Sequence, residues 1–266
     1  MFSSRAAIDH SDGVYGFGFD QPIRAVILGA RGGVGAALAS QITQRHEANR
    51  VLLTSRQPER SSHIWERLDI TSPSSWSSLV DRLHDELQRW DGELNLVINA
   101  TGLLHRAAEN DQAELMPERS LKGIELASME EVFAVNTFGV ALALKHLTPL
   151  LPRAQRSIFA SFSARVGSIG DNRIGGWYSY RASKAAQNML IKNAAIELAR
   201  TKRACICVAV HPGTVATELS APFTKSVKHT IFTPEESASH LLKVFTELTT
   251  ERSGESIAWD GVTIIP

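Results

Sequence analysis

The chain has 266 residues, of which 43% are hydrophobic and 21% charged, and its formal net charge at pH 7 is zero. This length is ample for one α/β domain with a well-buried core. A balanced charge without basic runs argues against a nucleic-acid-binding surface, and no run approaches the 18 apolar residues of a membrane span. We therefore expect neither nucleic acid nor membrane as a partner.

The N-terminal residues and the two cysteines bear on where in the cell the protein is expected. The first twenty residues contain three aspartates and no continuous apolar core, which argues against a signal peptide. We expect residues 1–20 to form a flexible extension and residues 21–266 to form a single domain. The two cysteines, Cys205 and Cys207, lie too close on one apolar run for an unstrained disulfide. Buried thiols of this kind are typical of a reducing compartment, so we expect a cytoplasmic protein.

Apolar runs alternate with amphipathic stretches along the chain. Strands are predicted at 23–28, 51–55, 94–100, 157–162, 204–211 and 256–259. Helices are predicted at about 36–44, 76–87, 129–147 and 178–200, and after Thr233-Pro234, where a Thr cap precedes Pro at the first helical position. The connections are a polar one over 56–70, a long arm over 103–128 and a loop over 214–232. This alternation predicts an α/β Rossmann fold, a doubly wound parallel sheet with helices on both faces.

A glycine-rich turn, GARGGVG, follows the first strand directly. Gly29, Gly33 and Gly35, with Val34 between the last two, stand between a buried strand and a helix. Glycine allows the tight turn and lets the backbone approach a pyrophosphate, which the N-terminus of the helix attracts. We predict that these four residues bind a dinucleotide. A tight turn without a ligand is the alternative.

The end of the second strand bears on the choice of cofactor. An acidic residue there would bind the ribose of NAD, whereas an arginine accommodates the 2′-phosphate of NADP. The residues are Ser55 and Arg56, with no carboxylate before Glu59, and Arg31 lies in the glycine turn. The sequence favours NADP over NAD, although both arginines would also suit a solvated surface.

A tyrosine and a lysine four residues apart are the candidate chemistry. Tyr180 and Lys184 begin a predicted helix, so both side chains lie on one face. An ammonium beside a phenol favours the phenolate and lowers its pKa towards the working range. Tyr178 has Ala182 at the same spacing and lacks a cation. The scattered histidines show no paired spacing of the H-E-x-x-H kind, so no metal site is predicted.

Taken in order, these motifs resemble the classical short-chain dehydrogenase/reductases. The resemblance covers about residues 23–265 and rests on the glycine turn, Asn99-Ala100-Thr101-Gly102, Asn136, the Tyr180/Lys184 pair and Pro212-Gly213. Four phrases are similar to the branch of C-factor-like proteins and carbonyl reductases. They are MPERSL at 116–121, FAVNTFG at 133–139, ARVGSIGDN at 164–172 and GGWYSYRASKAA at 175–186.

The resemblance implies a role for each motif. Tyr180 would be the acid/base residue, Lys184 would lower its pKa and bind the nicotinamide ribose, and Asn136 would hold a water in a proton relay. The adenine of the cofactor would contact Asp69 and Ile70, and its ribose side would contact Asn99, Ala100 and Gly102. Its nicotinamide end would be covered by Pro212, Gly213, Val215 and Thr217. Helices 129–147 and 178–200 would form the interface of a homodimer or homotetramer.

The serine that holds the substrate oxygen is less firmly located. Ser163 directly follows a predicted strand, as the catalytic serine of the family does. It lies seventeen residues before Tyr180, about four more than the common family spacing, so Ser161 and Ser168 stay open.

The resemblance implies an NAD(P)-dependent oxidoreductase, with NADPH-dependent reduction of a carbonyl, or the reverse alcohol oxidation, as the expected reaction. The apolar residues within 218–232, Val227 among them, favour a small apolar carbonyl substrate. Two alternatives remain: a dinucleotide-binding sensor or signalling protein with incidental catalysis, and another reaction on the same scaffold, such as epimerisation.

Overall fold

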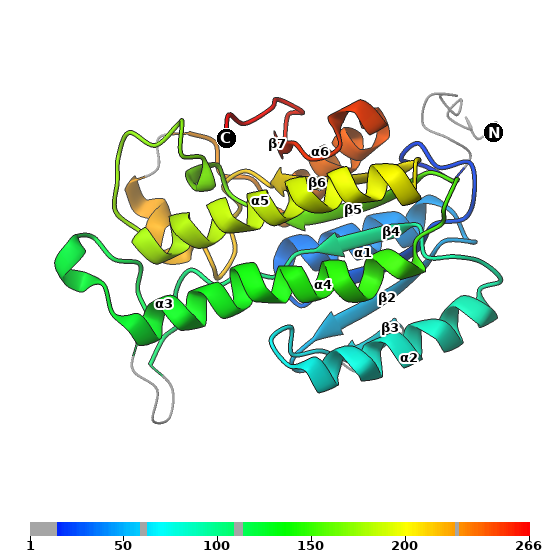
Figure 1. Cartoon of the computed structure of the whole chain (residues 1–266), viewed down its shortest axis with the longest axis horizontal. Coiled ribbons are helices and arrows are strands. Elements are labelled where there is room, and N and C mark those ends of the chain that lie inside the picture. Colours follow the sequence, from blue (N-terminus) through cyan, green and yellow to red (C-terminus); the bar gives the residue numbers. More distant parts are fainter. Residues whose placement is uncertain (1–14, 59–62, 109–113, 227–228) are drawn as a thin grey trace, which may run out of the picture.

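The chain folds around one parallel sheet of seven strands in the order β3-β2-β1-β4-β5-β6-β7 (Figure 1). The computed structural model describes residues 15–58, 63–108, 114–226 and 229–266. The strands are β1 (Arg24–Leu28), β2 (Arg50–Ser55), β3 (Ile64–Arg67), β4 (Leu96–Asn99), β5 (Ser157–Phe162), β6 (Cys205–His211) and β7 (Ser256–Ala258). The predicted Rossmann fold is confirmed.

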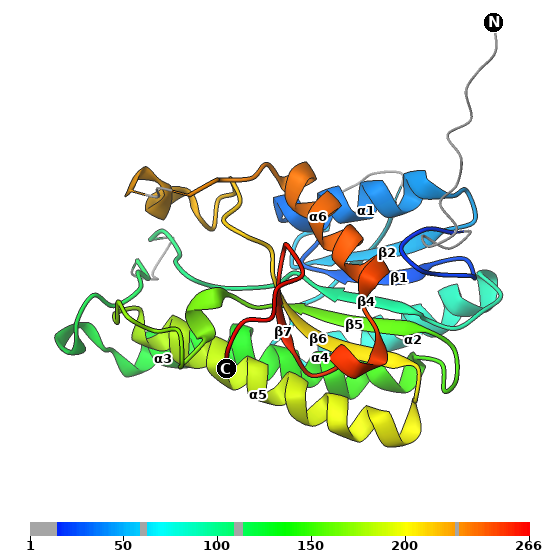
Figure 2. The same cartoon turned by 90° about the horizontal axis from the view of Figure 1, so that it is seen from above.

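Helices cover both faces of this sheet (Figure 2). They are α1 (Gly33–Arg45), α2 (Pro73–Arg89), α3 (Leu126–Phe133), α4 (Gly139–Leu147), α5 (Tyr178–Thr201) and α6 (Pro234–Glu247). Figure 2 shows α1 and α6 on one face and α2, α4 and α5 on the other. The strands alternate accordingly: Ile27 packs towards α1 and α6, and Leu28 packs towards α2 and α4.

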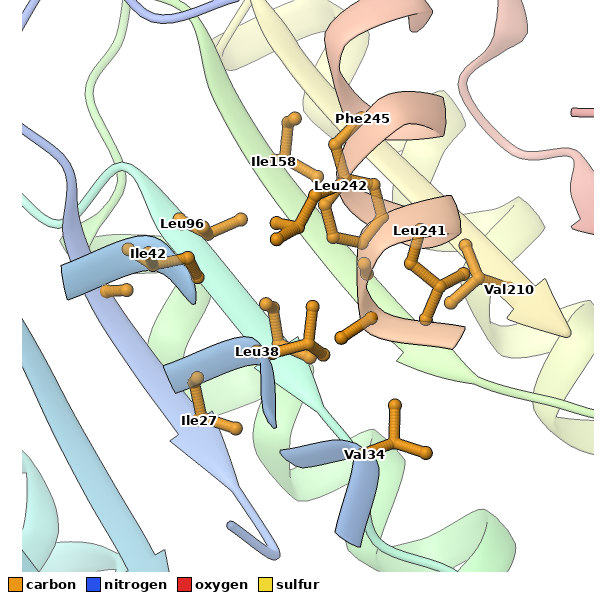
Figure 3. Close-up of a cluster of buried hydrophobic side chains, with 14 of the residues drawn as sticks. Ile27, Val34, Leu38, Ile42, Leu96, Ile158, Val210, Leu241, Leu242 and Phe245 are labelled. Carbon is orange, nitrogen blue, oxygen red and sulfur yellow. The ribbon is translucent and has the colours of Figure 1, made fainter. Parts of the chain in front are cut away.

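The core on the α1/α6 face is built mainly from aliphatic side chains, which surround Phe245 in Figure 3. Phe245 of α6 is fully buried and belongs to the same cluster as Leu38 of α1, Leu96 of β4 and Ile158 of β5. At about 25 cal/mol per Å² of buried apolar surface, such side chains supply most of the stabilisation of the fold. They anchor the two helices whose N-termini lie at the carboxyl edge of the sheet.

Residues 15–20 do not form the flexible extension that the sequence predicted for 1–20. Phe19 is 2% exposed and belongs to the core, and the guanidinium of Arg156 lies 5.7 Å from the centre of its ring. Tyr15 packs edge-on against His46. The isolated aromatics gave no periodic pattern, so their burial was not readable from the sequence. Residues 1–14 lie outside the described part of the chain.

Two further elements differ from the sequence prediction. The polar connection predicted at 56–70 contains β3, whose residues are half-buried or exposed and pair only with β2. Such an edge strand lacks the apolar run of a buried one. The helix predicted at 129–147 begins earlier, and a π-helical turn, Ala134–Phe138, separates α3 from α4. The extra residue in this turn changes the direction in which the Asn136 side chain leaves an otherwise continuous helix.

The start of α6 follows the sequence prediction. Thr233 caps this helix: its hydroxyl accepts a bond from the backbone N–H of Glu236, and the Glu236 carboxylate accepts one from the N–H of Thr233. Pro234 occupies the first turn. This capping box places α6 beside the glycine turn.

Candidate active site

Tyr180 and Lys184 lie together on the buried face of α5. Their exposed fractions are 7% and 2%, and Lys184 Nζ is 5.9 Å from the centre of the Tyr180 ring. A Cβ added to Gly167 would lie 2.7 Å from Lys184 Cβ, so the turn after β5 packs directly against the helix. The predicted pair is therefore held at the carboxyl end of β5.

The Lys184 ammonium has two fixed acceptors. It donates to the carbonyl oxygen of Phe162 at 2.8 Å and to Oε1 of Gln187 at 2.9 Å. Gln187 was not among the residues that sequence reasoning selected. Its position three residues after Lys184, on the same helical face, is the signal that would have identified it.

The electrostatics of the pair differ from the sequence prediction. Burial raises the pKa of Tyr180 above its ordinary value, and burial lowers the pKa of Lys184 to about 7. In the cofactor-free protein, burial of the phenol thus outweighs any lowering of its pKa by the Lys184 ammonium, and the catalytic role of Lys184 stays a prediction. Near neutral pH, Tyr180 holds its proton and is a proton donor.

The three candidate serines have different surroundings. The Ser161 hydroxyl is fully buried and accepts bonds from Asn99 Nδ2 at 3.1 Å and Gln187 Nε2 at 3.0 Å. The Ser168 hydroxyl accepts from the backbone N–H of Asp171. Ser163 follows β5, and its hydroxyl donates to Asn188 Oδ1 at 2.7 Å, one turn beyond Lys184. Both bonds commit the Ser161 hydroxyl to the interior, whereas Ser163 and Ser168 both stay candidates for the serine that holds the substrate oxygen.

Asn136 joins the arm to the catalytic helix. It is 1% exposed, and its amide forms two 2.8 Å bonds with the backbone of Leu103 and a third, of 3.1 Å, with Ser183 Oγ. A Cβ at Gly102 would lie 3.7 Å from Asn136 Oδ1 and 3.8 Å from Lys184 Nζ. The structure thus brings the predicted residues Gly102, Asn136 and Lys184 together.

The glycine turn has the shape that a pyrophosphate needs. Gly29 has a φ of 74°, and a Cβ at Gly35 would lie 2.9 Å from Ala30 Cα, so larger residues would distort both positions. Helix α1 begins at Gly33 with no side-chain cap and no acidic residue in its first turn. Its N-terminal N–H groups and dipole therefore suit an anion. Val34, also predicted, is buried in this first turn.

Thr217, which was predicted at the nicotinamide end of the cofactor, lies across the glycine turn. A Cβ at Gly33 would lie 3.4 Å from the Thr217 methyl and 2.9 Å from Pro234 Cγ. The loop after β6 therefore meets the glycine turn. The residues present fit a dinucleotide, with the pyrophosphate between α1 and this loop.

The residues predicted to bind the adenosine half of the cofactor lie together at the ends of β2 and β3. Arg31 Nη1 donates to Gln57 Oε1 at 2.8 Å, and the Gln57 N–H donates to Ser55 Oγ. The Asp69 carboxylate is partly buried, which raises its pKa. Its bonds from Thr71 and the charges of Arg56 and Arg67 outweigh burial, and the net pKa is lowered. Glu59 lies outside the described residues.

Some other side chains that were predicted to contact the cofactor instead pack or form hydrogen bonds within the protein. Ile70 is buried, and a Cβ at Gly139 would lie 2.8 Å from its side chain. Asn99 Oδ1 accepts two bonds from Thr101, which closes the turn after β4 beside Ala100. The side chains of Ile70 and Asn99 are thus structural. Their contacts with a cofactor, and that of Ala100, stay predictions.

The predicted nicotinamide end is a turn held under α6. The Pro212 carbonyl accepts a bond from Ser237 Oγ at 2.8 Å, and Gly213 has a φ of 83°. A Cβ at Gly213 would lie 2.8 Å from the Phe232 ring, and Val215 pairs with Phe232 through an isolated bridge. Only glycine fits both the backbone conformation and this contact. Among the described residues, no group of His, Cys, Asp or Glu is placed to hold a metal ion.

Glu118 of the arm caps the catalytic helix. Helix α5 has no side-chain cap at Trp177 and no acidic residue in its first turn. The buried Glu118 carboxylate accepts bonds from the backbone N–H and the hydroxyl of Ser179, directly before Tyr180. A carboxylate is stabilised at the positive end of the helix dipole. This contact spans 61 residues and was not predicted.

Rings from three segments meet around the phenol. Trp177, whose φ of 51° is unusual for a residue other than glycine, lies edge-on to Tyr180 and to Phe223. Phe223 contacts His105 of the arm. A small cavity between the arm and Tyr180 is lined mainly by apolar side chains, among them Leu104, Leu115 and Val132. The surroundings of the Tyr180 side chain are therefore apolar and aromatic.

A glycine turn after the first strand of a parallel sheet, facing a buried tyrosine and lysine, defines a dinucleotide-binding oxidoreductase of the Rossmann type. The chain belongs to the short-chain dehydrogenase family, whose model matches residues 24–228.

Individual relatives agree with this assignment. The chain is 31% identical over 194 residues to 1-hydroxy-2-glutathionyl-2-methyl-3-butene dehydrogenase of Rhodococcus sp. (strain AD45), covering 73% of this chain and 76% of the relative. It is 29% identical over 145 residues to C-signal of Myxococcus xanthus, covering 54% and 82%. NADPH-bound carbonyl reductase from chicken fatty liver superposes with a TM-score of 0.77 at 25% identity, covering 92% and 95%. The protein is an NAD(P)-dependent oxidoreductase.

The cap by Glu118 predicts a specific loss of stability. Glu118→Ala leaves the first turn of α5 without an acceptor, and we expect the free energy of unfolding to fall by about 1–2 kcal/mol. Urea denaturation followed by circular dichroism measures the loss. Glu114→Ala, an exposed glutamate in the same arm outside any helix, is the control and is expected to change stability by less than about 0.5 kcal/mol. Equal losses in the two variants would show that the carboxylate does not act as a cap.

Proposed function

We propose that the protein catalyses NADPH-dependent reduction of a carbonyl compound, or the reverse alcohol oxidation, with Tyr180 as the acid/base residue. The observation that carries this proposal is the buried Tyr180/Lys184 pair on α5, at the sheet edge that also holds the glycine turn. A sensor that only binds a dinucleotide needs no buried proton donor, so this pair also favours the enzyme over the signalling alternative.

The proposed mechanism assigns a step to each side chain. A nicotinamide cofactor would supply a hydride to the carbonyl carbon when bound. Tyr180 donates its proton to the carbonyl oxygen, which becomes the hydroxyl of the alcohol. The Ser163 hydroxyl gives the oxygen a second hydrogen bond, which stabilises the negative charge that develops there. The Lys184 ammonium stabilises the phenolate left on Tyr180, and Asn136 supports the return of a proton.

The apolar surroundings of Tyr180 support a small apolar carbonyl substrate. Apolar side chains of the arm and of α3, among them Leu104, Leu115 and Val132, lie beside the phenol. The rings of Trp177 and Phe223 cover the neighbouring side. Val227, part of the apolar segment at 218–232, lies outside the described residues. In the proposed mechanism, the hydroxyls of Tyr180 and Ser163 both contact the reacting oxygen of the substrate.

Substituting Tyr180 tests the proposed acid/base role. We expect Tyr180→Phe to lower kcat by about 10²–10⁴-fold, the usual contribution of a positioned proton donor, while NADPH binding measured by fluorescence is retained. A carbonyl panel assayed through nicotinamide absorbance measures the loss. Tyr178→Phe is the matched control because Tyr178 has Ala182, and not a cation, one turn on. Full turnover by Tyr180→Phe on a substrate of the wild type would refute the role.

NADP rather than NAD is the cofactor that we propose, because Arg31 and Arg56 flank the end of β2 and residues 54–58 contain no carboxylate. A charge-assisted bond from arginine to phosphate contributes about 1.5–3 kcal/mol. We therefore expect Arg31→Ala/Arg56→Ala to raise KM for NADPH by about 10- to 100-fold and to leave KM for NADH nearly unchanged. Arg50→Ala, at the other end of β2, is the control. An equal rise for both cofactors would contradict the assignment.

A homodimer or homotetramer is also proposed, because apolar side chains are exposed on α3, on the π-helical turn and on α5. Leu126, Phe138 and Met189 are 70%, 58% and 61% exposed. Exposed apolar side chains of this kind are typical of contact surfaces.

The helical stretch Leu126–Leu150 is long and apolar enough to cross a membrane, but core helices of other proteins are as well.

Sedimentation velocity tests the proposed association. We expect wild-type protein to sediment as a dimer or tetramer at micromolar concentration, and Phe138→Glu/Met189→Glu to sediment as a monomer because two charges would be buried in the contact. Leu121→Glu, an exposed apolar position in the arm, is the control. A monomeric wild type would refute the proposal.

A further inference from the structure

Gln187 is a fully buried glutamine whose amide is bonded at both ends. Its Oε1 accepts the bond from Lys184 Nζ at 2.9 Å, and its Nε2 donates to Ser161 Oγ and to the Phe162 carbonyl, each at 3.0 Å. Burying an amide is unfavourable unless hydrogen bonds replace those made with water. Here every polar atom of the side chain has a partner, so the residue forms part of a closed polar network.

This network reaches across the carboxyl edge of the sheet. Ser161 Oγ also accepts from Asn99 Nδ2, so Gln187 connects α5 to the ends of β4 and β5. The strands are rigid elements of the core, and they hold the amide in one orientation. The oxygen of that amide therefore presents a fixed acceptor to Lys184.

Because the Gln187 oxygen is fixed, the direction of the remaining N–H group of the Lys184 ammonium is fixed as well. A lysine ammonium has three N–H groups. Two of those on Lys184 are used by the Phe162 carbonyl and by Gln187. The third is left for the Tyr180 side of the site and for the ribose of a bound cofactor. Without the Gln187 oxygen, the ammonium would be free to rotate towards other acceptors.

The same contact bears on the charge of Lys184. Burial lowers the pKa of this lysine to about 7, and burial is the only cause of the shift within the described part of the chain. Tyr180 is the titratable group of its own helix that faces it. From β5 it meets the Ser161 network and the Phe162 carbonyl, and from the turn after β4 it meets Gly102. Neutral oxygen dipoles are thus what favours the cationic form.

We propose that Gln187 is a positioning residue that keeps the Lys184 ammonium charged and directed towards Tyr180. The proposal rests on the catalytic role proposed above for Lys184. Gln187 touches neither the substrate nor the reacting atoms, and it acts through the lysine.

Two substitutions of similar size test this role, and they are expected to move the pKa of Lys184 in opposite directions. Gln187→Met removes the acceptor, and Gln187→Glu replaces it with a carboxylate. Because an acceptor favours the charged form, the Met variant lowers the pKa of Lys184 and the Glu variant raises it, each by about one pH unit. Carbonyl reduction that needs a cationic lysine loses activity as pH rises through that pKa. The alkaline limb of kcat/KM therefore moves to lower pH in the Met variant and to higher pH in the Glu variant.

A measurement independent of turnover accompanies the pH profiles. The cofactor-free protein is labelled with 13Cε-lysine, the Lys184 resonance is assigned with Lys184→Met, and its pKa is read from an NMR titration. Gln41→Met and Gln41→Glu are the controls, because Gln41 lies on the exposed side of α1 and bonds to the Glu235 carbonyl. We expect both controls to titrate as the wild type.

The outcomes separate the two proposals. Opposite movements of the Lys184 pKa in the two Gln187 variants support the positioning role. An unchanged pKa in the Glu variant overturns it, even if the Met variant does not fold. If Lys184→Met retains full reductase activity, the proposed function fails, while the NMR titration still decides what Gln187 does to the lysine.

Discussion

The pairing of β1 with both β2 and β4 is the constraint on which the site depends. All three strands are parallel, and the register aligns Leu28 of β1 with Thr54 of β2 and with Asn99 of β4. The chain leaves β1 towards one face of the sheet and reaches α4 and α5 on the other. The carboxyl ends of β1 and β4 therefore border a crevice, where the glycine turn and the turn at Thr101 face each other. A ligand that spans this crevice meets both helical layers.

Buried charge at this edge is stabilised by neutral groups. The Lys184 ammonium bonds to a backbone carbonyl and to an amide, and the Glu118 carboxylate bonds to a backbone N–H and to a hydroxyl at the start of α5. Oriented dipoles of this kind stabilise charge without a counter-ion whose own desolvation would be costly. Within the described ranges, no carboxylate is paired with Lys184, so its charge is not neutralised by a counter-ion.

The sequence predicted regular elements well where burial follows a local period. Six of the seven strands and the capping box at Thr233 agree with the structure to within one or two residues at each end. It missed β3 because an edge strand with half-exposed residues lacks that period. It missed the π turn around Asn136 because a single extra residue leaves the apolar spacing of a helix almost unchanged.

By itself, the sequence determined the parallel α/β fold and the glycine turn, and it predicted Tyr180 rather than Tyr178 as the acid/base residue, because each depends on residues a few positions apart. Only the tertiary structure decided that Glu118 caps α5, that Gln187 holds Lys184 and that Ser161 is committed to the core. These contacts join residues 61, 3 and 62 positions apart. Even the short one depends on β5, because the strand turns the amide and the ammonium towards each other. The tertiary structure also reversed the expected pKa of Tyr180, since burial is set by the packing of distant segments.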